Sequence, residues 1–247
     1  MTERLPEYCT LLIIGPPGVG KLGWILDATK KALENREKVV FVTLDLHPSE
    51  IRNSLLHFGV EPQSINSRQI FFVDSYSCTL GGDSAPQPSK GIYPIRKPSN
   101  IGEMHEAISK SVQELGRPAR ILFYSLTTAF LYNSVQTIVK FFQMLSSRVK
   151  SEYGSATFTL HEGVHENSTV HLLSSFVDGV IQMRFNEDLD REWRIHHLRG
   201  VSTSPRWKCF DVNKYAFITN PHGKRIESCL YDYEYEVKPK KKEAQHP

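Results

Sequence analysis

The chain has 247 residues, of which 40% are hydrophobic and 23% are charged, and its formal net charge is +3. This length allows one large α/β domain or two small ones, and the composition supplies enough apolar material for a sizeable core. Wholesale disorder, a collagen-like chain and a small disulfide-rich scaffold are therefore excluded. So weak a positive charge does not by itself indicate a nucleic-acid partner.

The cysteines and the apolar runs bear on the compartment. The four cysteines are scattered and form no CxxC pair, which argues against a zinc site or disulfide chemistry. No apolar run approaches 18 residues, so we expect no membrane span. Polar and acidic residues precede the short apolar stretch 11–14, unlike the long apolar region of a secretory signal. We therefore expect a soluble, cytoplasmic protein.

The first half of the chain alternates strand-like and helical patterns. β-branched and aromatic runs predict strands, and amphipathic spacing after them predicts helices. The predicted elements are a strand at 9–14, a helix at about 23–35, a strand at 38–44, a helix from Pro48 to about 58, and a strand at 69–74. Strands that alternate with helices favour a parallel sheet covered on both faces, so the fold class is α/β.

Residues 76–100 interrupt this pattern, because glycine and proline recur throughout them. We predict a long loop there, of the kind that is functional or mobile. The later elements are predicted as a helix at 101–115, a strand at 120–124, a helix at about 135–149, strands at 155–160 and 176–183, and short antiparallel strands from 192 onward. We expect a single domain over 1–236 and a charged flexible tail at 237–247.

A glycine-rich stretch between the first strand and the first helix satisfies the pattern GxxxxGK. Its residues are Gly15, Pro16, Pro17, Gly18, Val19, Gly20 and Lys21. Glycines let the backbone curve around phosphate oxygens so that N–H groups point inward, and the helix adds the positive end of its dipole. The lysine side chain reaches the outer phosphates. We therefore predict a phosphate-binding loop.

The metal-binding residues expected around such a loop are missing. The position after Lys21 normally carries a Ser or Thr whose hydroxyl coordinates Mg²⁺, but here it is Leu22. A hard cation needs oxygen ligands, so we expect Mg²⁺ to bind poorly. The strand at 120–124 ends in Tyr124 where an ATPase carries an aspartate. Asp45, after the second strand, is the remaining carboxylate that could position water, or it caps the helix that begins at Pro48.

These residues together resemble the KaiC-like branch of the RecA-superfamily ATPases, especially its small single-domain archaeal members. The resemblance extends from Cys9 to about Thr219. The stretches that carry it are GPPGVGK, FVTLDLHPSEIRNSLLHFG, FFVDSYS, ILFYSLTTAFLYN, SSFVDGVIQMRF and HHLRGVSTSPRWKCFDV. It implies a RecA-like P-loop NTPase fold with a mostly parallel central sheet, flanking helices and antiparallel strands towards the C-terminus.

The resemblance also implies roles for individual residues. The family has two acidic residues before His-Pro, one of which activates water, whereas this chain has Asp45 and Leu46. A basic pair that reaches the γ-phosphate of the neighbouring subunit is matched by His197 and Arg199. A glutamine that senses the nucleotide is matched by His161.

We therefore expect a degenerate RecA-fold protein that binds ATP or ADP and hydrolyses it slowly or not at all, because phosphoryl transfer depends on the metal and on an oriented water. Its role would be regulatory or scaffolding. The resemblance implies association with itself or with a related ATPase, in a ring. A protein-interaction module that binds no nucleotide, in which Lys21 is a relic, is the rival interpretation.

The stretch from His161 to His165 reads HEGVH, a literal HExxH, which in zinc hydrolases lies on a helix. Glu187 or His171 could be a third ligand. The motif follows a strand-like run and contains Gly163, a poor helix former, so a loop leaving a strand is the favoured interpretation, and we expect no metal site.

Two further groups of residues have alternative interpretations. His196 and His197 could form a ligand pair, but neighbours in a strand point to opposite faces. Aromatic and basic residues near the C-terminus could stack on and pair with DNA, although strand packing is the favoured interpretation. They are Trp193, Trp207, Tyr231, Tyr233, Tyr235, Arg194, Arg199, Arg206, Lys208, Lys224 and Arg225.

Overall fold

The computed structural model describes residues 8–66, 68–80, 89–200, 202–204, 206–212 and 217–220. In this part of the chain the strands form one sheet with the order β10-β9-β8-β7-β1-β6-β5-β2-β3-β4. The parallel strands, in order across the sheet, are β7 (Gly179–Phe185), β1 (Thr10–Gly15), β6 (Gly154–His161), β5 (Ala119–Tyr124), β2 (Lys38–Thr43), β3 (Ile70–Asp74) and β4 (Ile92–Pro94).

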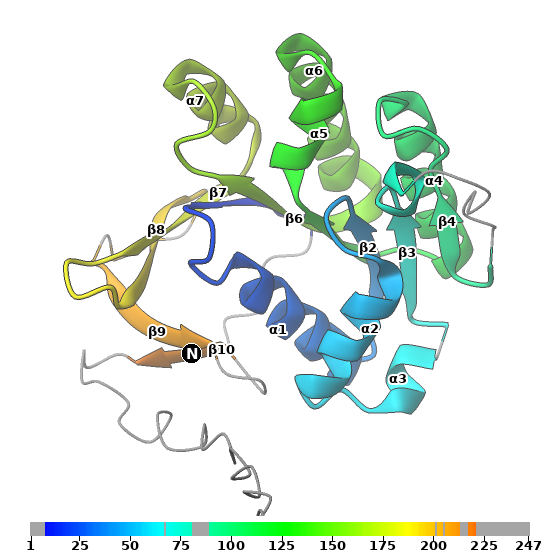
Figure 1. The fold of residues 1–247 in the computed structure, drawn as a ribbon, viewed down its shortest axis with the longest axis horizontal. Helices are drawn as coiled ribbons and strands as arrows, with labels where there is room; N and C mark the ends of the chain where they lie inside the picture. Colours follow the sequence, from blue (N-terminus) through cyan, green and yellow to red (C-terminus); the bar gives the residue numbers. More distant parts are fainter. Residues whose placement is uncertain are drawn as a thin grey trace, which may run out of the picture.

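Three strands extend the sheet beyond β7 in antiparallel fashion, as the sequence predicts. They are β8 (Arg191–Leu198), β9 (Lys208–Val212) and β10 (Phe217–Asn220). Figure 1 shows these strands curving towards the side of the sheet on which α1 lies. This curvature places β9 beside the phosphate loop.

Helices cover both faces of the parallel part of the sheet (Figure 1). One face carries α1 (Lys21–Glu34), α2 (Pro48–His57) and α3 (Pro62–Asn66), and the other carries α4 (Ile101–Leu115), α5 (Leu126–Tyr132), α6 (Val135–Arg148) and α7 (Asn167–Phe176). Two short helical segments, η1 (Ser77–Thr79) and η2 (Val149–Tyr153), lie between these elements. The mixed α/β class with a mostly parallel sheet is confirmed.

Each face of the sheet has its own apolar core, because successive strand residues point to opposite sides. Val40, Val42 and Phe123 pack towards α4 and α6, whereas Val39 and Phe41 pack towards α1 and α2. All five side chains are fully buried. Strands buried on both faces read as continuous apolar runs, which is why the sequence identified them.

The structure corrects the prediction of two strands and adds two helices, α3 and α5, that the sequence analysis does not predict. The loop predicted at 76–100 contains η1 and β4, and β4 pairs in parallel with β3, so the segment adds a strand to the sheet. Residues 81–88 of this loop lie outside the described residues. The strand predicted at 176–183 begins only at Gly179, because Phe176 ends α7 and Val177 is its C-cap.

The predicted tail at 237–247 lies outside the described residues, as does most of the segment after Asn220. None of the helices in the described part of the chain is long and apolar enough to span a bilayer.

Candidate functional site

The predicted phosphate loop joins β1 to α1 at the carboxyl edge of the parallel strands. Gly18 has a φ of 77° and Gly20 a φ of 111°, a backbone region that side-chain-bearing residues rarely adopt. Gly20 is also the N-cap of α1, and Val19 between the two glycines is fully buried. The glycines of the pattern therefore shape a turn that presents the first N–H groups of α1 to the loop interior.

Lys21 folds back onto its own loop. Its Nζ donates to the carbonyl oxygens of Gly15 (2.6 Å) and Pro16 (2.7 Å), and the residue is only 4% exposed. Burial lowers the pKa of Lys21 from 10.5 to about 8, and the nearby Glu162 carboxylate offsets part of this shift. A phosphate in the loop would compete with the two carbonyls for the same ammonium protons.

The end of β6 lies directly against this loop. The N–H of Glu162 donates to the carbonyl of Gly15 (3.0 Å), which also accepts from Lys21. His161 pairs with Gly15 in the β1–β6 ladder and donates its own N–H to Thr127 Oγ1 (2.8 Å). Burial, the Lys21 charge and His165 lower the pKa of His161, so its ring is neutral at physiological pH. The structure thus brings His161 and Lys21 together.

The residues at the expected magnesium and water-activating positions do not suit either role. Leu22, Leu46 and Tyr124 are partly buried and pack against one apolar cluster that contains Phe41 and Leu122. Neither leucine has an oxygen in its side chain. The Tyr124 phenol is neutral at physiological pH, and burial and the Asp45 charge raise its pKa further, to about 12. Mg²⁺ requires near-octahedral oxygen ligands, and this apolar substitution removes them.

Asp45 is the carboxylate that remains at the end of β2. Thr128 of α5 donates a hydrogen bond to its Oδ1, and burial raises its pKa. The alternative that Asp45 caps α2 is wrong, because the N-cap is His47, whose Nδ1 accepts from the N–H of Ser49. Asp45 therefore faces α5.

A cleft of about 490 Å³ opens beside the loop. Its walls are the loop and first turns of α1, the end of α2, and the β8–β9 strands; the lining residues are Gly18, Gly20, Leu22, Gly23, Leu26, Ser54, His57, Phe58, Arg191 and Val212. Val212 packs so closely on α1 that a Cβ at Gly23 would come within 2.5 Å of it. Arg191 Nε is buried and has no hydrogen-bond partner among the described residues.

His197 and Arg199 lie near the start of β7, at the amino edge of the parallel strands, whereas the phosphate loop of their own chain lies at the carboxyl edge. Arg199 pairs with Asp178 (Nη1 to Oδ1, 3.1 Å) and donates its N–H to the carbonyl of the same residue (2.7 Å). Asp178 Oδ2 accepts from the N–H (3.0 Å) and hydroxyl (2.8 Å) of Thr10, at the start of β1. Any contact of Arg199 with a phosphate loop would have to involve a second chain.

Regular strand geometry predicts that the two adjacent histidines of β8 point to opposite faces of the sheet. The structure differs from this prediction. The β7–β8 pairing shifts register between Val180 and Ile181. His197 pairs with Val180 and Ile195 with Ile181, so His196 is the extra residue of a β-bulge. The rings of His196 and His197 consequently lie 5.7 Å apart.

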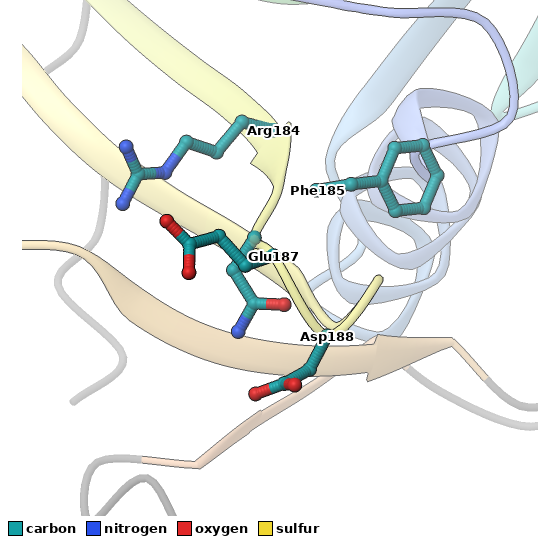
Figure 2. A pocket seen from close by; sticks show the side chains of 5 residues that line it. Arg184, Phe185, Glu187 and Asp188 are labelled. Carbon is teal, nitrogen blue, oxygen red and sulfur yellow. The ribbon is translucent and has the colours of Figure 1, made fainter.

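The HExxH motif occupies a strand end and a turn, as predicted, so its histidines are not one helical turn apart. His161 ends β6, Gly163 has a φ of 75°, and the His165 ring packs on Phe130 with centroids 4.4 Å apart. Glu187 lies in the β7–β8 turn, where residues 184–188 line a hollow of about 500 Å³ (Figure 2), and His171 lies on α7. Within the described residues no three potential ligands converge.

Trp193 of β8 and Trp207, which precedes β9, both pack against neighbouring side chains. Arg184 and Arg194 lie over the ring of Trp207, with guanidinium carbons 4.0 and 4.4 Å from its centroid. Trp193 packs edge-on against Trp24 (centroids 5.3 Å). Strand packing, the favoured interpretation, describes these two tryptophans. Tyr231, Tyr233, Tyr235, Lys224 and Arg225 lie outside the described residues.

A RecA-like sheet with a phosphate loop after its first strand defines a P-loop protein. The model of the family described as "ATPase: KaiC" matches residues 1–222. The chain therefore belongs to the KaiC ATPase family and is a nucleotide-binding RecA-fold protein.

Relatives of the same length support this assignment. A UPF0273 protein of Methanocaldococcus jannaschii is 27% identical over 224 residues, covering 88% of this chain and 90% of the relative. A UPF0273 protein of Aeropyrum pernix is 24% identical over 227 residues, with 88% and 87% covered. The crystal structure of a KaiC-like protein from Pyrococcus horikoshii superposes with a TM-score of 0.70 at 18% identity, covering 88% of this chain and 91% of that one.

Proposed function

We propose that this protein binds ATP or ADP without efficient hydrolysis and acts as a regulatory or scaffolding subunit. The observation that carries the proposal is the contrast within one site. The phosphate loop keeps its glycine conformations and Lys21, while apolar packing fills the metal and water-activating positions with Leu22, Leu46 and Tyr124. Binding depends on the loop, and phosphoryl transfer depends on the metal and an oriented water.

The cleft beside the loop supports a nucleoside ligand. Leu22 and Leu26 line one wall and Val212 another, which suits the apolar face of a base. The unpaired Nε of Arg191 offers a donor to an oxygen or nitrogen of the ligand. These features favour a nucleotide over inorganic phosphate alone.

The proposal is tested by thermal unfolding with ATP or ADP, each with Mg²⁺ or EDTA, together with a sensitive phosphate-release assay. A ligand that binds only the folded state raises the melting temperature by mass action. We expect a rise that does not depend on Mg²⁺, no rise in Lys21→Ala, and no measurable turnover. Robust Mg²⁺-dependent turnover would contradict the pseudo-ATPase proposal, and the absence of any nucleotide-dependent rise would favour the interaction module.

We also propose that the protein associates with itself or with a related ATPase. The position of Arg199 supports this proposal, because it lies at the edge of the sheet remote from its own phosphate loop, so that only the loop of another chain could meet it. Light scattering after size-exclusion chromatography, with and without nucleotide, measures the mass. A monomer under every condition would refute self-association and leave association with a related ATPase as the remaining form of the proposal.

A further inference from the structure

The charged side chains around the phosphate loop bear on whether a nucleoside diphosphate or a triphosphate binds more tightly. Lys21 is the cation that the loop itself supplies, and both its hydrogen bonds go to loop carbonyls. The backbone of Glu162 lies against the loop, because its N–H donates to Gly15 O (3.0 Å), and the residue is exposed. The charge of its carboxylate raises the pKa of Lys21, against the larger lowering by burial.

Among the described residues, the other titratable groups at the ends of β2 and β6 add no positive charge, and the Arg191 guanidinium lines the cleft from the β8–β9 side. Asp45 is a second carboxylate, at the end of β2, and it accepts a hydrogen bond from Thr128. Burial lowers the pKa of His161 and of His165, so both rings are neutral. Among these groups, one ammonium is set against two carboxylates.

A triphosphate places more charge at this end of the site than a diphosphate does. In a P-loop ATPase the bound metal bridges the β- and γ-phosphates and neutralises that charge. Here Leu22 and Tyr124 stand at the magnesium positions and do not fit that ion. A β-phosphate would still rest in the cradle of N–H groups at the start of α1, whereas a γ-phosphate would add charge near the end of β6, where Glu162 lies, without a metal ion to neutralise it.

We propose that the site selects a nucleoside diphosphate over a triphosphate, and that Glu162 is the residue that sets this selection. The inference rests on the proposed nucleotide binding and adds to it the class of nucleotide. The charge balance, the backbone hydrogen bond of Glu162 to Gly15, and the apolar packing of the metal positions carry it together.

The test is isothermal titration calorimetry with ADP and with ATP, in EDTA and in Mg²⁺, on the full chain. The variants are wild type, Glu162→Gln and a control, Glu106→Gln, which removes the same charge from an exposed position on α4. We expect wild type to bind ADP at least about tenfold more tightly than ATP, which corresponds to about 1.4 kcal/mol. Glu162→Gln should tighten ATP binding severalfold and leave ADP nearly unchanged, and Glu106→Gln should keep the wild-type ratio.

The outcomes separate the inference from the function beneath it. Equal or tighter binding of ATP in wild type, or a marked tightening of ATP by Mg²⁺, would overturn the diphosphate preference. An unchanged ADP-to-ATP ratio in Glu162→Gln, or the same change in Glu106→Gln, would overturn the role of Glu162. Binding of neither nucleotide to wild type would overturn the proposed function itself. Glu162→Ala serves as a second variant, because the residue lies in an exposed turn.

Discussion

Nucleotide affinity should fall as the pH rises through 8, because Lys21 must carry its charge to bind phosphate. Burial in the loop lowers the pKa of Lys21 to about 8. About nine-tenths of the molecules then carry a charged Lys21 at pH 7 and about one-tenth at pH 9. If only the charged form binds, the association constant for ADP or ATP drops about tenfold between these two values.

The sign of this dependence follows from proton linkage. A phosphate bound beside the ammonium raises the pKa of Lys21, so the complex holds more protons than the free protein at pH values between about 8 and the higher pKa of the complex. Affinity therefore declines with rising pH across that window and is flat below it. His161, with its lowered pKa, and Tyr124, whose pKa is about 12, do not titrate between pH 7 and 9.

Calorimetric titrations at pH 7, 8 and 9, repeated in buffers of different ionisation heat, measure both the affinity and the protons taken up. Lys21→Arg is the control, because a guanidinium stays charged throughout this range. Its affinity should be independent of pH. A flat profile in wild type, or an equal slope in Lys21→Arg, would refute the assignment of the dependence to Lys21.

Three further predictions concern the surroundings of the loop. Gly23→Ala should destabilise the fold by about 1–3 kcal/mol in urea unfolding, because its Cβ would meet Val212 at 2.5 Å, and adding Val212→Ala should restore most of the loss. The absence of rescue would mean that β9 does not press on α1. Asp45→Asn should raise the melting temperature near pH 7, since burial raises the pKa of Asp45 and penalises its charge, and this gain should vanish below about pH 4; a gain that persists at low pH would contradict this cause. Asp178→Ala should cost about 2–4 kcal/mol and Arg199→Ala under about 1 kcal/mol, because Asp178 is buried while Arg199 is 67% exposed in its side chain; similar losses would refute this ranking.

Local signals made most of the fold predictable. The helix predicted at 101–115 has those bounds because Asn100 caps it by accepting from the N–H of Glu103 and because Gly116, with a φ of 86°, ends it. The start of β7 was misplaced because Phe176 and Val177 form one apolar run across the end of a helix and the approach to a strand. β4 was missed because it has only three residues and ends in proline.

The loop of the candidate site was predictable, and its contacts were not. The spacing of Gly15, Gly20 and Lys21 identified the loop, but no pattern in the sequence shows that Lys21 donates to its own carbonyls. The pairing of Arg199 with Asp178 depends on the β7–β8 register. The position of Glu162 beside Gly15 depends likewise on the parallel pairing of β1 and β6, which joins segments far apart in the chain.

The short strand β4 is the edge strand of the sheet beside β3, and its backbone determines whether a further strand can pair there. Backbone N–H groups alternate in direction along a strand. Just after β4, the N–H of Ile95 points towards β3 and donates to Asp74 O (2.8 Å), so the backbone nitrogens of Ile92 and Pro94 point away from β3. The N–H of Ile92 donates to Ser89 O (2.8 Å), and Pro94 has no backbone N–H. Neither outward-pointing backbone nitrogen of β4 is therefore available to donate to another strand. This protects the described edge of the sheet against edge-to-edge pairing, which leads to aggregation.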